Sequence, residues 1–140
     1  MLIKLLNPTI TAPTRATDKA AGFDIYMPAD GIAHPGYTVS VPLGFATAIP
    51  EGYAAIMLPR SSIGSQGLEI MNTAGLIDQD FRGEWVVKLQ TKPGYKAIAW
   101  KAGERVVQFT LVPVWIGQPE IVTQLPETNR GTAGFGTTGA

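Results

Sequence analysis

The chain of 140 residues has the length of one domain, and 45% of its residues are hydrophobic, enough to bury a core. Eleven basic and eleven acidic side chains cancel, which argues against attraction of the whole molecule to nucleic acid or anionic membranes, so any anion site must be local. There is no cysteine, which excludes disulfides and thiolate metal sites. We expect no targeting segment, because the N-terminal apolar patch is too short, and no run approaches the roughly 20 apolar residues that cross a bilayer.

Short runs of β-branched and aromatic residues alternate with the 16 glycines and 11 prolines, a pattern that predicts an all-β sandwich or barrel. The pattern leaves room for only one short helix, near residues 61–66. In chain order, the expected strands are Leu2 to Leu6, Gly22 to Met27, Tyr37 to Val41, Phe45 to Ile49, Tyr53 to Leu58, Trp85 to Thr91, Lys96 to Trp100, Arg105 to Val114 and Glu120 to Thr123.

Polar residues first interrupt this pattern at Asp24, in AGFDIY. An unpaired carboxylate inside an apolar strand is costly, so Asp24 either faces outward or faces a metal ion or a partner. The next polar segment, PRSSIGSQG, supplies the Arg60 guanidinium and the Ser61 and Ser62 hydroxyls at the start of the expected helix. These donors suit a phosphate group, although a capped polar loop has the same composition.

The segment NTAGLIDQDFRGE, residues 72–84, combines two glycines, an apolar pair and two acids. It predicts a hairpin leading into the strand Trp85 to Thr91. Strand side chains repeat every two residues, so we expect Asp78 and Asp80 to share a face. A solvated turn has the same residue types.

Two further polar segments follow. GERVVQF carries Arg105 and Gln108 on a strand, which an ordinary edge strand with a solvated face also explains. The tail from Pro126 is poor in apolar residues, so we expect it to be mobile. Its glycine-rich run RGTAGFGTTG allows close approach of backbone N–H groups to phosphate, and Phe135 within it suits stacking on a base; a disordered end is the alternative.

In order and approximate spacing, these five segments resemble the five motifs of the trimeric dUTPase family (deoxyuridine 5′-triphosphate nucleotidohydrolase). The resemblance implies a β jelly roll of the β-clip type, assembled as a homotrimer with active sites at subunit interfaces. It further implies a core of residues 1–125 and a flexible C-terminal arm, residues 126–140, donated to another subunit. The implied activity is Mg²⁺-dependent hydrolysis of dUTP to dUMP and pyrophosphate in the cytoplasm, or the host cytoplasm for a viral protein. This reaction prevents uracil incorporation into DNA and supplies dUMP for dTMP synthesis.

The resemblance also implies residue roles. Asp78 would activate the attacking water, Phe81 would lie against the deoxyribose, and Asp24 would reach the metal through water. Uracil would be recognised by Asn72 and the backbone of Gly75, Leu76 and Ile77. Phosphates would be bound by Arg60, Ser61, Ser62 and Gln108, and the arm would contribute Arg130, Gly134, Gly136 and Thr137, with Phe135 stacking over the base. Three positions depart from the commonest family pattern: Phe81 replaces Tyr, Ala133 replaces Gly and Thr137 replaces Ser.

Three alternatives stay open. A dCTP deaminase resembles this fold, although such chains generally run longer and use a catalytic Glu that is not evident here. A non-catalytic protein on the same scaffold would act through a regulatory protein partner. A structural jelly-roll subunit would leave the polar segments without purpose. We expect the protein to bind neither membranes nor nucleic acid directly. The single histidine, His34, is interpreted as a surface or packing residue.

Overall fold

The computed structural model describes residues 1–134 and confirms an all-β jelly roll. In chain order the elements are β1 (Leu2–Leu5), β2 (Phe23–Tyr26), β3 (Gly31–Ala33), β4 (Val39–Pro42), β5 (Phe45–Ala48), β6 (Tyr53–Pro59), α1 (Ser61–Gly64), β7 (Leu68–Ile70), β8 (Gly75–Ile77), β9 (Val86–Thr91), β10 (Ile98–Trp100) and β11 (Arg105–Pro113). Within residues 1–134, no helix has the length and apolar character needed to cross a membrane.

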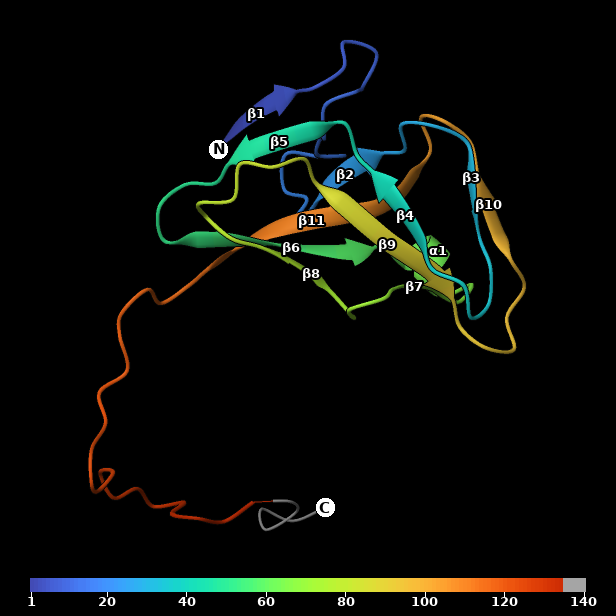
Figure 1. Ribbon diagram of the computed structural model, residues 1–140. Coiled ribbons are helices and arrows are strands. Elements are labelled where there is room, and N and C mark those ends of the chain that lie inside the picture. Colours follow the sequence, from blue (N-terminus) through green and yellow to red (C-terminus); the bar gives the residue numbers. More distant parts are fainter. Residues whose placement is uncertain (135–140) are drawn as a thin grey trace.

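The strands form two larger antiparallel sheets and two ribbons (Figure 1). One sheet has the order β2-β11-β6-β8 and the other the order β4-β9-β7, while β1 pairs with β5 and β3 with β10. The core lies between the sheets, because buried Met57 and Phe109 of the first sheet belong to the same cluster as Val87 and Leu89 of the second.

Alternation of side chains explains why β9 can cover this core. Val87, Leu89 and Thr91 are fully buried, whereas Val86 and Lys88 are exposed, as expected for a strand with one face on a core. Aromatic rings then connect the elements across the core. The ring centroids of Phe23 and Phe109 lie 5.0 Å apart, those of Phe109 and Trp85 5.0 Å, and those of Trp85 and Phe45 5.2 Å.

The strand β6 occupies the centre of the first sheet. It pairs with β11 from Tyr53↔Pro113 to Val107↔Pro59, and on its other edge with β8, from Ala55↔Ile77 to Met57↔Gly75. The helix α1 follows β6 directly, whereas the loop after β8 lies at the opposite end of β6 (Figure 1). The two ends of β6 therefore carry different polar segments.

Most of the expected strands are confirmed with shifted ends, and the short helix is confirmed as α1. Two strands of three residues each, β3 and β7, escaped prediction because so short a run has too little periodicity to detect. The expected strand Glu120 to Thr123 is wrong: these residues are not in a strand, and Ile121 is 100% exposed.

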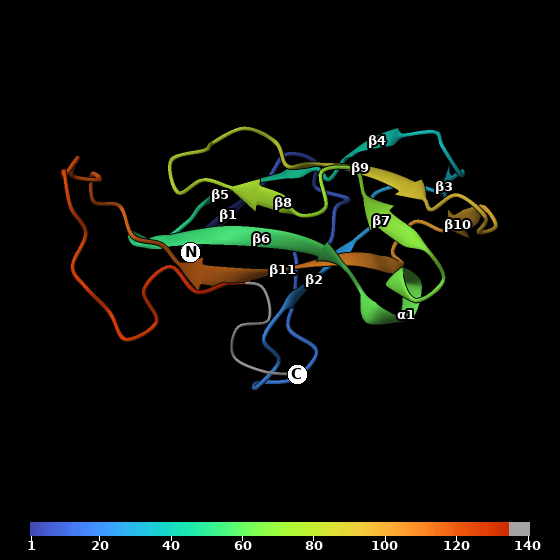
Figure 2. The same cartoon turned by 90° about the horizontal axis from the view of Figure 1, so that it is seen from below.

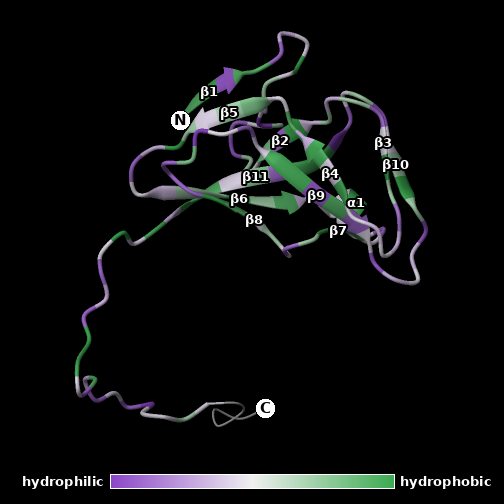
Figure 3. Ribbon diagram, viewed as in Figure 1, coloured by the Kyte–Doolittle hydropathy of each residue, from purple (hydrophilic) through white to green (hydrophobic). Residues whose placement is uncertain are grey.

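Beyond Val114, whose N–H donates to the Gly52 carbonyl (2.9 Å), the chain runs away from the barrel (Figure 1). This segment carries large apolar side chains that the barrel does not cover. Several stretches of its ribbon are green, the colour of hydrophobic residues, in Figure 3. Ile121, Leu125 and Trp115 are the most exposed of these side chains, at 100%, 77% and 75%.

Candidate active site

The strands β7 and β8 frame a pocket of about 670 Å³, a size typical of small-molecule sites. Each strand is the last in its sheet, so each has one edge without a strand partner. The connecting turn, residues 71–74, carries Asn72, which lines the pocket with Gly75, Leu76 and Ile77. The structure thus brings together all four residues expected to recognise the base.

Only glycine fits at position 75, because the Met57 side chain approaches its backbone closely. A Cβ on this residue would lie 2.9 Å from Cε of Met57 and 3.2 Å from its Cβ. The absence of a side chain lets β8 pack directly on β6. The pocket therefore runs along β8, whose unpaired edge offers N–H and C=O groups that can recognise a ligand's hydrogen-bonding edge.

Asp78 follows β8, and the prediction that Asp78 and Asp80 share a strand face is wrong. The strand ends at Ile77, and a turn begins in which the Phe81 N–H donates to the Asp78 carbonyl (3.2 Å). Both acids are exposed and line a second hollow of about 440 Å³, together with Tyr53. Leu76 lines both hollows, so the acid-bearing turn adjoins the β7–β8 pocket.

Side chains that the sequence analysis did not single out hold this turn. The Gln79 side-chain oxygen accepts the Gly52 N–H (3.0 Å), and Arg82 donates to the carbonyls of Gln79 (2.7 Å) and Phe81 (3.0 Å). The Phe81 ring lies against Gly83, where a Cβ would be 2.6 Å from the ring. No sequence signal identifies the bond between Gln79 and Gly52, because the two residues are distant along the chain.

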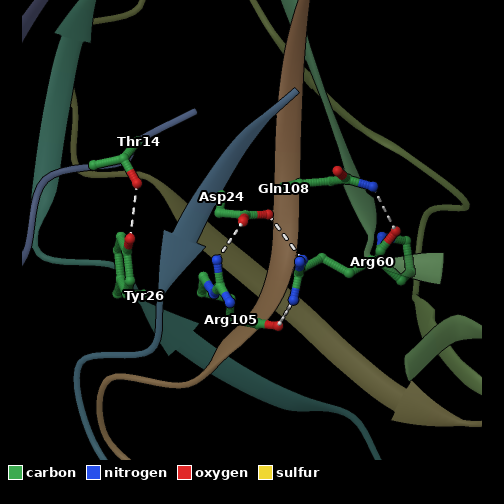
Figure 4. A network of polar contacts seen from close by, with 7 residues as sticks. Thr14, Asp24, Tyr26, Arg60, Arg105 and Gln108 are labelled. Carbon is green, nitrogen blue, oxygen red and sulfur yellow. Dashed lines mark hydrogen bonds and ion pairs between the residues drawn. The ribbon is translucent and has the colours of Figure 1, made fainter. Parts of the chain in front are cut away.

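Asp24 lies at the other end of β6, between two guanidinium groups (Figure 4). Its Oδ1 is 2.8 Å from Arg60 Nε and its Oδ2 is 3.2 Å from Arg105 Nη1, and only 8% of the side chain is exposed. Asp24 therefore does not face outward, and its buried charge is compensated by partners. The sequence placed Arg105 on a strand without assigning it to the site.

The other expected phosphate-binding residues surround this cluster. Gln108 Nε2 donates to the Pro59 carbonyl at 3.4 Å (Figure 4), and Gly22 leaves room for the amide, since a Cβ there would lie 2.9 Å from Gln108 Oε1. Ser61 and Ser62, both exposed, open α1, so their hydroxyls stand next to Arg60 along the chain. The cluster thus gathers cationic and neutral donors on the open end of β6.

Within one chain these two groups of residues are far apart. Asp78 lies against Tyr53 and Ala54 at the start of β6, and Arg60 follows the end of the strand. Arg60 lies six positions after Ala54, about 20 Å at the rise of a β-strand. Asp78 and Arg60 of one chain are therefore placed at opposite ends of β6.

The arm supplies a third group. Arg130 Nε donates to the Ala133 carbonyl (2.8 Å), and Ala133 does not have the positive φ that would strain a residue other than glycine. Gly134 is the last residue described, and the expected contacts of Phe135, Gly136 and Thr137 lie outside the described residues. Arg130 is exposed, on the segment that runs away from the barrel of its own chain (Figure 1).

A jelly roll with a pocket at the edge strands β7 and β8 and an Arg–Asp–Arg cluster defines the structural class. Residues 9–139 match the family model of dUTPase. The deoxyuridine 5′-triphosphate nucleotidohydrolase of Desulfotalea psychrophila is 41% identical over 134 residues, which cover 94% of this chain and 89% of the relative. The deoxyuridine 5′-triphosphate nucleotidohydrolase of Pseudomonas syringae pv. tomato is 38% identical over 145 residues, which cover 98% of this chain and 95% of the relative. The chain belongs to the dUTPase family.

Solved structures of phage proteins share the fold. The dUTPase of Staphylococcus bacteriophage 80alpha, in complex with dUpNHpp, has a TM-score of 0.88 at 24% identity, covering 99% of this chain and 98% of that one. A mutant dUTPase from phage phi11 of S. aureus, which coordinates a structural Mg(II) ion, has a TM-score of 0.78 at 21% identity. The match covers 88% of this chain and 96% of the phage chain.

We predict that Asp24→Asn lowers the free energy of unfolding by about 1–3 kcal/mol, because a charge-assisted partner of two partly solvated guanidiniums is lost. Urea unfolding measures this change. Asp30→Asn is the matched control: Asp30 pairs with Lys101 (2.7 Å) on the surface, where hydrogen bonds from Lys101 and the Ala102 N–H lower the pKa of the Asp30 carboxyl. If Asp24→Asn lowered the free energy of unfolding by no more than Asp30→Asn does, the cluster around Asp24 would have no stabilising role.

Proposed function

We propose that this protein is a dUTP diphosphatase, which hydrolyses dUTP to dUMP and pyrophosphate. The observation that carries the proposal is the pocket lined by the edge strand β8, with Asp78 on the turn that follows directly. Membership of the dUTPase family supports the substrate. The reaction removes a precursor of uracil in DNA and supplies dUMP for dTMP synthesis.

Uracil recognition follows from the chemistry of the pocket. The base edge offers an acceptor, a donor and an acceptor, which strand N–H and C=O groups of Gly75 to Ile77 match, and Asn72 adds an amide. Cytosine has an acceptor at N3 and an amino donor at position 4, the reverse of uracil, so polar groups of the pocket would be left without a partner. We expect the pocket to exclude the extra methyl of thymine, because β8 and Met57 are packed too closely at Gly75 to move apart for it.

Hydrolysis requires one base and several charge-stabilising donors. Asp78 accepts a proton from water as the water oxygen attacks the α-phosphorus, and the bond to the β-phosphate oxygen breaks to release pyrophosphate. Arg60, Ser61, Ser62 and Gln108 bind the phosphates and stabilise the charge that develops on their oxygens. Phe81 lies against the deoxyribose and leaves no room for a 2′-hydroxyl.

We also propose that Mg²⁺ takes part. Among residues 1–134 no three His, Cys, Asp or Glu side chains converge, and Mg²⁺ commonly uses substrate phosphates, waters and one carboxylate. Asp24 fits this mode, because each carboxylate oxygen that accepts from a guanidinium keeps a lone pair for a metal-bound water. When bound, the metal would neutralise phosphate charge.

The separation of Asp78 from Arg60 supports a shared site in a homotrimer. If the Asp78 turn of one subunit faces the Arg60 cluster of a second, both halves meet one triphosphate. The arm would then reach another subunit, where the exposed Trp115, Ile121 and Leu125 find apolar surface, and Arg130, Gly134, Phe135, Gly136 and Thr137 close over the nucleotide.

We expect pyrophosphate release from dUTP in Mg²⁺, loss of that activity in excess chelator, and little release from dCTP, dTTP or UTP. The same assay with dCTP, monitored for ammonia, separates the deaminase alternative. No release from any nucleotide by the folded protein would contradict the proposed activity and favour a binding role.

We expect Asp78→Asn to lower kcat for dUTP by about 10²–10⁴-fold, the usual contribution of a general base, with little change in the affinity for dUTP. Asp80→Asn is the matched control, because Asp80 is exposed in the same turn and lines the same hollow. Equal losses in the two variants would show that the charge of the turn, rather than Asp78 itself, is needed.

We expect two inactive variants to complement each other. In trimers reassembled from equal amounts of Asp78→Asn and Arg60→Ala subunits, about one quarter of the shared sites combine an intact Asp78 with an intact Arg60. Activity should therefore return to about a quarter of the wild-type value after mixing and reassembly, whereas each variant alone stays inactive. A mass other than three times the 14.9 kDa of the chain, or no recovery after proven subunit exchange, would contradict the shared site.

A further inference from the structure

The turn at the β7–β8 pocket contains an unusual backbone conformation. Thr73 is the one residue other than glycine with a positive φ, +69°, among residues 1–134. A β-branched residue is disfavoured there, because its Cβ substituents crowd the backbone, and Gly, Asn or Asp is the usual occupant. Strained residues of this kind persist only where the surrounding structure holds them, and they concentrate at functional sites.

Two hydrogen bonds define the turn. The Thr73 N–H donates to the Ile70 carbonyl (2.8 Å), and the Ala74 N–H donates to the Asn72 carbonyl (2.7 Å). A bond between residues i+2 and i around a central residue of positive φ is the rarer and more strained form of γ-turn. The chain therefore reverses within three residues, directly after Asn72 and directly before β8.

Both ends of the turn are fixed by other elements. On one side the Met71 N–H donates to the Lys88 carbonyl of β9 (3.0 Å), and on the other Gly75 packs on Met57 of β6. The turn thus connects the two sheets over a short distance, as the view in Figure 2 shows for β7 and β8. A strained conformation is maintained because both sheets oppose its relaxation.

We propose that Thr73 is a positioning residue, whose restricted positive-φ turn fixes Asn72 and the start of β8 in the arrangement that binds the base. This inference rests on the proposed function and deepens it. Thr73 lowers the stability of the ligand-free protein. In return it raises the affinity for substrate, since a preorganised pocket loses less conformational entropy when the ligand binds. Glycine at this position would relieve the strain and release the turn.

The test compares Thr73→Gly with wild type in the assembled protein. We expect KM for dUTP to rise about 5–20-fold with kcat changed less than about 2-fold, because the loss is in ground-state and transition-state binding alike. We expect the melting temperature without ligand to rise by about 2–4 °C, because strain is removed from the folded state. A purely structural role would instead lower both stability and affinity.

Two further variants sharpen the result. Thr11→Gly changes an exposed threonine whose φ is not positive, so its melting temperature should not rise and its KM should match wild type. Thr73→Val keeps the β-branched shape without the hydroxyl, and its KM should stay near wild type.

The inference is overturned if Thr73→Gly leaves KM unchanged, if it lowers the melting temperature, or if Thr73→Val raises KM as much as Thr73→Gly does. The last result would show a direct contact by the hydroxyl. Failure of the wild-type protein to hydrolyse dUTP is a separate outcome, which overturns the proposed function and this role with it.

Discussion

The pairing of β6 with β11 on one edge and with β8 on the other is the constraint on which the site depends. Through β11 it brings Arg105 and Gln108 beside Arg60, and through β8 it positions the strand that lines the β7–β8 pocket. The same strand separates these two groups by its own length. A single chain therefore holds the two halves of the proposed site at opposite ends of β6, and this separation supports the proposal of a site shared between subunits.

The parts of the molecule that sequence predicted are those set by local chemistry. Alternation in β9, the proline and glycine boundaries of β6, and the grouping of polar residues into short segments all depend on neighbours along the chain. The bonds from Asp24 to Arg105 and from Gln79 to Gly52 depend instead on which strands pair and in which register. The failed strand at Glu120 to Thr123 shows the same limit, because an apolar run forms a strand only where a partner edge exists.

The error about Asp78 and Asp80 has a specific physical cause. A period of two holds only while the backbone stays extended, and the bond between the Phe81 N–H and the Asp78 carbonyl ends the strand before either acid. The turn suits the role proposed for Asp78: an acid in a strand facing the core would be buried, whereas Asp78 in the turn is exposed. Gln79 and Arg82 restore the rigidity that the strand would have supplied.

The proposed site combines a rigid part, built on the barrel, with the C-terminal arm. The pocket and the Asp24 cluster are built from paired strands, a strained turn and ion pairs to one buried carboxylate, so we expect them to change little when a nucleotide binds. The arm, in contrast, leaves the barrel of its own chain, and its ordering over a nucleotide costs conformational entropy at each binding event. Base discrimination therefore belongs to the rigid part, which acts before closure. In the proposed function, exclusion of water from the phosphates would belong to the arm, whose closure would strengthen the charge interactions of Arg60 once the correct nucleotide is bound.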